Sequence, residues 1–176
     1  MAIIRNWEND LEKYENFLKN INVAKYSQLR RIKTVEQDLP KDLLPLELYY
    51  HYYWDTMDFK DYDEIFAIYW REKLSPYVYE FIKKYFYGCS LQFVEEGFKA
   101  RLYRIWMSIL TQFHFQYLWN ALFEEKLNSS AELDKKGIDA IVKISGKKLL
   151  FKLKRFLIAE RHLTGGLRKL NKNMLI

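Results

Sequence analysis

The chain has 176 residues, of which 49% are hydrophobic and 18% aromatic, so it can bury one core and is not a disordered chain. Its single cysteine excludes an internal disulfide and fits a reducing compartment such as the cytoplasm, and no membrane span is expected because no apolar run of about 18 residues occurs. The net charge of +6 is uneven, because residues 135–176 carry 12 Lys and Arg against 2 acids, which points to a polyanion partner or to a solubilising tail.

The first part of the chain predicts one helix followed by irregular sequence. Asn6–Asn20 has apolar residues at steps of three and four behind a capping asparagine, which predicts an amphipathic helix. Val23–Pro40 is polar and irregular, and it carries a basic cluster at Arg30, Arg31 and Lys33. Such a cluster either contacts phosphates or forms a solvated face.

The middle of the chain predicts a largely helical layer. The rings of Leu46–Met57 suit core packing better than base stacking, and Asp61–Tyr87 predicts two helices that meet at a proline. Ser90–Phe123 predicts the longest helix, although polar residues break Gln112–Trp119 with a period of two, which leaves a strand open there. Glu96 on this helix is either an acid near a catalytic site or one half of an ion pair.

Only the stretch before the C-terminal segment predicts two short strands joined by a turn. Ile138–Ile144 alternates apolar residues, Ser145–Lys147 breaks the run as a hairpin turn does, and Leu149–Leu153 returns as a second strand. Antiparallel pairing would bring Asp139 and Lys154 near each other at the open end of this hairpin. Taken alone, the aspartate is as well explained as a turn residue, and lysines beside strands keep an edge soluble.

Several strings of the sequence resemble one family when they are taken in order. They are K-T-V-E-Q-D-L-P at 33–40, Y-G-C-S at 87–90, A-R-L-Y-R at 100–104, T-Q-F-H-F-Q-Y at 111–117, E-L-D at 132–134 and G-I-D-A at 137–140. In this order and at these spacings the chain resembles the TaqI restriction endonuclease family, from about Tyr14 to about Lys154. The hairpin also resembles the PD-(D/E)xK nucleases, which hold a metal with an aspartate on one strand and an acid-x-lysine on the next.

The resemblance implies a fold and a reaction. The expected fold is α/β (α+β), with a helical N-terminal layer and a small, partial PD-(D/E)xK-like sheet. Residues 1–154 would form the endonuclease domain, and residues 155–176 would be a basic, poorly ordered tail. The implied reaction is Mg²⁺-dependent hydrolysis of double-stranded DNA at TCGA, and cutting a palindromic site favours a homodimer while leaving the oligomeric state open.

The resemblance also implies roles for particular residues. Asp139 and Asp134 would ligate Mg²⁺, and Lys154 would stabilise the negative charge that grows on the phosphate. The residues expected to contact DNA are Arg30, Arg31, Lys33 and Lys152.

Two features depart from the family pattern. Lys152 stands where the family has glutamine or an acid, and a cation beside a metal weakens its binding. The segment from Arg155 onward does not resemble the family, and a truncation or an altered reading frame near Lys152 would account for both departures. The alternative functions are therefore a catalytically disabled, mostly helical DNA-binding fragment or a protein-interaction module built on the tyrosine-rich helices.

Overall fold

A computed structural model describes residues 5–32 and 43–152. This part of the chain is mostly helical and contains one two-stranded antiparallel sheet. In chain order the elements are α1 (Trp7–Asn20), the 3₁₀ helix η1 (Val23–Arg30), α2 (Leu46–Tyr50), the π-helix η3 (His51–Asp55), α3 (Tyr62–Tyr69), the π-helix η4 (Trp70–Leu74), α4 (Val78–Tyr85), α5 (Leu91–Leu122), α6 (Ala131–Lys135), β1 (Ala140–Ile144) and β2 (Lys147–Phe151). The expected helical layer with a small sheet is confirmed in this coarse form, and the expected tail at 155–176 lies outside the described residues.

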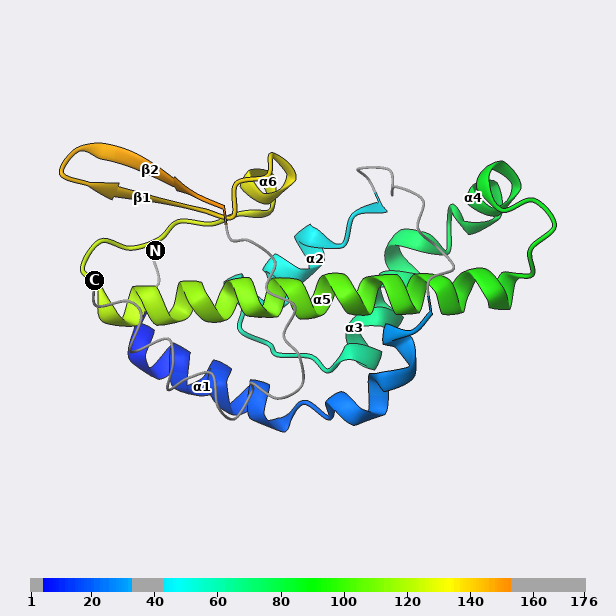
Figure 1. Cartoon of the computed structure of the whole chain (residues 1–176), viewed down its shortest axis with the longest axis horizontal. Coiled ribbons are helices and arrows are strands. Elements are labelled where there is room, and N and C mark those ends of the chain that lie inside the picture. The colour runs from blue at the N-terminus through cyan, green and yellow to red at the C-terminus, as the bar shows by residue number, and fades with distance from the viewer. Residues whose placement is uncertain (1–4, 33–42, 153–176) are drawn as a thin grey trace.

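The 32-residue helix α5 is the axis around which the other elements are arranged. In Figure 1, α1 runs along one side of α5, and α2, α6 and the β1–β2 hairpin lie on the other side. The helix begins after Ser90, whose Oγ accepts a hydrogen bond from a first-turn amide at 3.2 Å. Ile109, Phe113 and Tyr117 are buried at steps of four, so residues 112–119 follow the helical period and the open strand alternative is wrong.

Tyrosine side chains fill much of the core, and their hydroxyl groups bond to main-chain carbonyls. Tyr14 is fully buried and donates to the carbonyl of Leu110 at 2.8 Å, and Tyr117 donates to the carbonyl of Tyr53 at 2.8 Å. The indole of Trp106 donates to the hydroxyl of Tyr53 at 2.8 Å. These bonds satisfy polar atoms that would otherwise be costly to bury. Burial raises the pKa of Tyr14 well above its ordinary value, so this hydroxyl keeps its proton.

The aromatic stretch around α2 and η3 belongs to this core. Tyr49, Tyr50, Tyr53 and Trp54 are all buried, so the expected core packing is confirmed and these rings are not available to stack on bases. None of the helices in the described part of the chain has the length and apolar character that a membrane crossing requires.

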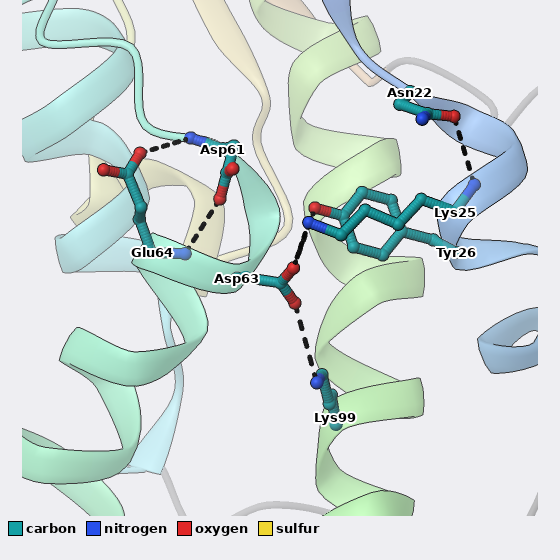
Figure 2. A network of polar contacts seen from close by, with 7 residues as sticks. All are labelled: Asn22, Lys25, Tyr26, Asp61, Asp63, Glu64 and Lys99. Atoms are coloured by element: carbon teal, nitrogen blue, oxygen red, sulfur yellow. Dashed lines mark hydrogen bonds and ion pairs between the residues drawn. The ribbon is translucent and has the colours of Figure 1, made fainter.

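An ion-pair network joins η1, α3 and α5 (Figure 2). The carboxylate of Asp63 on α3 accepts from Lys25 on η1 at 2.6 Å and from Lys99 on α5 at 3.5 Å. Tyr26 also donates to this carboxylate, at 3.3 Å. Partial burial raises the pKa of Asp63, but the two lysines outweigh it and lower the pKa below its ordinary value of 3.8. The carboxylate therefore stays ionised and connects three elements that are distant in sequence.

Local caps place the members of this network (Figure 2). Asp61 and Glu64 form a capping box at the start of α3, with bonds of 2.9 and 3.0 Å. Asn22 caps η1 through a bond of 3.2 Å. The prediction of an irregular 23–40 is wrong for 23–30, because Tyr26 and Leu29 are buried three residues apart, a spacing that a 3₁₀ helix brings to one face.

The predicted hairpin is confirmed, with a two-residue turn. Ser145 and Gly146 both have positive φ, +48° and +78°, as a type I′ turn requires, and Lys147 already pairs with Ile144. Ala140 and Val142 are buried from solvent in a small apolar cluster with rings from the C-terminal half of α5. The hairpin is thereby attached to the main helix by one of its faces.

Candidate functional site

The open end of the hairpin brings Asp139 next to Lys152. Ala140 pairs with Phe151, so the register extended by one residue places Asp139 opposite Lys152. The amide of Asp139 donates to the carbonyl of Phe151 at 3.0 Å, which holds the two strands together at this point. Directly opposite residues of an antiparallel pair share one face of the sheet. The ammonium of Lys152 lies 3.9 Å from the point where a Cβ on Gly137 would stand, so it also lies over the chain that leads into β1.

A tight turn brings Asp134 to the same end of the hairpin. Asp134 lies on α6 (Ala131–Lys135), which is capped by Ser130 and is followed, after Lys136, by Gly137 with a φ of +74°. The amide of Gly137 donates to the carbonyl of Asp134 at 2.8 Å, and the amide of Ile138 donates to that of Leu133 at 3.0 Å. These two bonds form a Schellman motif, which reverses the chain immediately after the helix. Only this short reversal separates Asp134 from the start of β1.

Two glutamines of α5 contact the segments that carry the two aspartates. Gln112 Nε2 donates to Asp134 Oδ2 at 3.0 Å, and Gln116 Nε2 donates to the main-chain carbonyl of Asp139 at 3.1 Å. Ser129 Oγ donates to the same carbonyl at 2.7 Å. Three segments that resemble the family, at 111–117, 132–134 and 137–140, therefore meet in one polar cluster. Sequence reasoning assigned no role to these glutamines, although the polar interruptions within 112–119 were the signal that could have identified them.

Tyr50 completes this cluster from α2. Its hydroxyl lies 2.5 Å from Ser129 Oγ and 3.1 Å from Gln112 Nε2. Burial raises the pKa of Tyr50 well above its ordinary value, so the hydroxyl keeps its proton and remains able to donate. Sequence reasoning missed this role because the ring stands in a run of tyrosines that pack the core.

An open cleft of about 470 Å³ adjoins the cluster. It is lined by Glu47, Tyr50, Asp55, Ser129, Ser130, Ala131 and Glu132. Glu47 forms ion pairs with Lys135 at 2.7 Å and with Lys73 at 3.3 Å, and these two lysines, Lys135 first, lower the pKa of its carboxyl. The rim of the cleft therefore carries opposite charges that are already paired.

The expected DNA-contacting residues do not all meet at the hairpin. Arg30 and Arg31 lie at the end of η1, and the neighbouring carbonyl of Ile32 accepts from Arg104 of α5 at 2.7 Å. Arg104 precedes Gln112 by eight residues, or about 12 Å along the helix axis. The structure brings together three of the expected site residues, Asp134, Asp139 and Lys152. Two others, Arg30 and Arg31, lie farther along α5. The remaining two, Lys33 and Lys154, lie outside the described residues.

The two aspartates offer the type of ligand that Mg²⁺ uses. Carboxylate oxygens suit this hard cation, which keeps several waters and is commonly held by one or two carboxylates together with substrate phosphates. Within residues 5–32 and 43–152, no group of three or more His, Cys, Asp or Glu could hold a metal ion. Glu96 does not join Asp134 and Asp139, because it precedes Gln112 by sixteen residues, or about 24 Å along α5. The donor set therefore fits a two-carboxylate site.

Comparison with known proteins identifies the class to which this chain belongs. A family model described as TaqI restriction endonuclease matches residues 11–176, so the chain belongs to this family of type II restriction endonucleases. The matched range continues past Lys154 to the last residue, which is farther than the resemblance expected from the sequence. No solved structure matches the chain.

Two curated relatives are similar over most of the chain. It is 47% identical over 150 residues to the type II restriction enzyme TaqI of Thermus aquaticus, and 45% identical over 150 residues to the type II restriction enzyme TthHB8I of Thermus thermophilus. Each match covers 82% of this chain and 57% of the relative. The chain therefore spans little more than half the length of these relatives.

Proposed function

We propose that the chain acts as a Mg²⁺-dependent endonuclease that hydrolyses phosphodiester bonds of double-stranded DNA at TCGA. The observation that carries this proposal is the polar cluster at the open end of the hairpin. There α5 holds Asp134 by its carboxylate and Asp139 by its main-chain carbonyl, through bonds of 3.0 and 3.1 Å. Membership of the restriction endonuclease family supports the reaction class.

Each site residue has a definite part in this proposal. Asp139 and Asp134 would hold the Mg²⁺ ion, which when bound polarises the phosphoryl group and lowers the pKa of its water. Lys154 would stabilise the negative charge that develops on the phosphate oxygens. Arg30, Arg31, Lys33 and Lys152 would contact the DNA backbone, which positions the duplex without reading its sequence.

The sequence preference and the assembly follow from the same proposal. Reading TCGA requires contacts to base edges in the major groove from side chains such as Arg, Lys, Asn or Gln. Because TCGA reads identically on both strands, two copies of the site related by a two-fold axis would cut both strands. We therefore propose a homodimer on DNA.

A second function, a DNA-binding fragment without catalysis, is favoured by one specific observation. The register puts the cation Lys152 opposite Asp139, at the end of the hairpin where Mg²⁺ would bind. A positive charge there opposes metal binding and favours phosphate binding. In this alternative the chain binds DNA with a steep dependence on salt and leaves it uncut.

Cleavage of a plasmid carrying TCGA sites distinguishes the two functions. The nuclease proposal expects discrete fragments with Mg²⁺, and none with EDTA or with Asp139→Ala. Asp58→Ala removes an exposed carboxylate outside the cluster and should leave cleavage unchanged. Uncut plasmid that is nevertheless bound, more weakly as salt rises, would refute the nuclease proposal and support the second function.

A further inference from the structure

We propose that Gln112 and Gln116 are positioning residues, which set the geometry of the two candidate metal ligands from the face of α5. The proposal rests on the nuclease function proposed above, because it assigns Asp134 and Asp139 to the metal. Gln112 would act through the carboxylate of Asp134. Gln116, together with Ser129, would act through the main chain of Asp139.

The two glutamines project from a well-packed part of α5. They are four residues apart, so they lie on one face of α5 one turn from each other. Phe113 and Tyr117, which follow each of them, are fully buried and hold this part of the helix in place. Asp134, by contrast, lies on the five-residue helix α6, and Asp139 lies in the connection before β1. Side chains from a rigid element therefore orient groups on short segments, as precise sites require.

The hydrogen bonds of the cluster assign a particular donor to Asp134. Ser129 has one proton, and its 2.7 Å contact with the carbonyl of Asp139 uses it. Tyr50 must then donate to Ser129 across 2.5 Å, since its own contact with Asp134 Oδ2 is much longer, at 3.5 Å. Among these groups, the amide of Gln112 is consequently the one that donates to Asp134 Oδ2, at 3.0 Å. A donor directed at one carboxylate oxygen fixes the rotation of the group.

Gln116 is buried in a way that packing alone does not explain. Its side chain is fully buried, and its Oε1 has no hydrogen-bond partner among the described residues. An apolar side chain of similar size would avoid this cost, because an unsatisfied buried acceptor is destabilising. What Gln116 contributes is Nε2, which donates to Ser129 Oγ and to the carbonyl of Asp139, each at 3.1 Å. These bonds fix the backbone from which the side chain of Asp139 projects.

Mg²⁺ affinity as a function of pH tests the role of Gln112. Gln112→Met keeps the length of the side chain and removes its donor, so we expect affinity to fall about 10- to 100-fold, as when the partner of a metal ligand is lost. The matched control is Gln92→Met, an exposed glutamine of the same helix, which should match the wild type in calorimetry.

A second variant replaces the donor at residue 112 by an acceptor. Gln112→Glu is isosteric and places an acceptor beside Asp134, so Mg²⁺ affinity relative to the wild type should be low at pH 7. It should recover towards pH 5 as the introduced carboxyl gains a proton and becomes a donor again. Tighter binding by this variant would overturn the proposal, because residue 112 would then be acting as a ligand.

Hydrogen exchange without metal separates this proposal from the nuclease function. Amides of residues 128–140 should exchange about ten times faster in Gln112→Met and Gln116→Met than in Gln92→Met. Mg²⁺ binding that is equal in the wild type and Gln112→Met would overturn the positioning role of Gln112 and leave the nuclease proposal standing. A wild type that binds no Mg²⁺ would overturn the nuclease proposal, and unchanged exchange in both glutamine variants would then overturn the positioning roles as well.

Discussion

Replacing Lys152 by glutamine should strengthen Mg²⁺ binding, because it removes a cation from the site. The register places Lys152 opposite Asp139, and the Cβ atoms of such pairs are roughly 5 Å apart. An ammonium at roughly 7 Å from a divalent ion is repelled by about 1 kcal/mol in a dielectric of water and by about 5 kcal/mol in one of 20. Because Lys152 is exposed, the lower part of this range applies, about 1–2 kcal/mol. Lys152→Gln should therefore lower the Mg²⁺ dissociation constant about 5- to 30-fold.

Lys148→Gln is the matched control for this substitution. Lys148 lies on the same strand and the same face as Lys152, and it is also exposed. It stands four residues away, or about 13 Å along the strand, which exceeds the screening length of about 10 Å at 0.1 M salt. Calorimetry at this ionic strength should show no gain for Lys148→Gln. An equal affinity for the wild type and Lys152→Gln would refute the reasoning, because the ammonium would then not face the bound ion.

Three further substitutions test the fold that supports the site. Asp63→Asn breaks ion pairs with Lys25 and Lys99 and should lower the free energy of unfolding by about 0.5–1 kcal/mol. This loss is small because the side chain of Asp63 is 38% exposed. The melting temperature should fall by about 1–4 °C. Since the pKa of Asp63 is lowered in the folded state, its contribution to stability is present above about pH 4 and is lost as the pH falls through the folded pKa. The melting curves of the variant and the wild type should therefore converge in acid. Gly146→Ala should lower the free energy of unfolding in urea by about 1 kcal/mol through backbone strain alone, because φ is +78° and no atom lies within 4 Å of the added Cβ. An unchanged urea midpoint would contradict the turn assignment. Tyr14→Phe should cost about 1 kcal/mol in the same assay, because a fully buried hydroxyl loses its bond to a carbonyl of α5, and an unchanged stability would show that this bond contributes nothing.

Local sequence chemistry predicted the elements whose boundaries are set locally. The caps Asn6 and Ser90 and the turn at Ser145–Lys147 were readable because a side chain or a positive φ determines the structure within a few residues. The irregular structure predicted for Val23–Pro40 was wrong at 23–30, because a short 3₁₀ helix leaves no 3.6-residue pattern in the sequence.

The candidate site was predictable only in part, for a similar reason. Asp134 and Asp139 could be proposed because the family resemblance implies their roles and because they stand close in sequence beside a hairpin. The contribution of Gln112 depends on a contact across 22 residues, and that of Tyr50 on a contact with Ser129 across 79 residues. The periodicity of a sequence does not show which face of a helix contacts which loop. The roles of Gln112 and Tyr50 could therefore be seen only in the packing of α2 and α5 around α6.

The location of the metal tests the central claim most directly. Mn²⁺ can replace Mg²⁺ at oxygen ligands and broadens the NMR signals of nearby nuclei. Substoichiometric Mn²⁺ should broaden the amide signals of Asp134 and Asp139 first, and Asp139→Asn should abolish the effect. The carboxylates of Asp61 and Asp63, on the network of α3, serve as the comparison within the same molecule. Broadening that begins at those residues, or that persists at Asp134 in Asp139→Asn, would contradict a metal site at the open end of the hairpin.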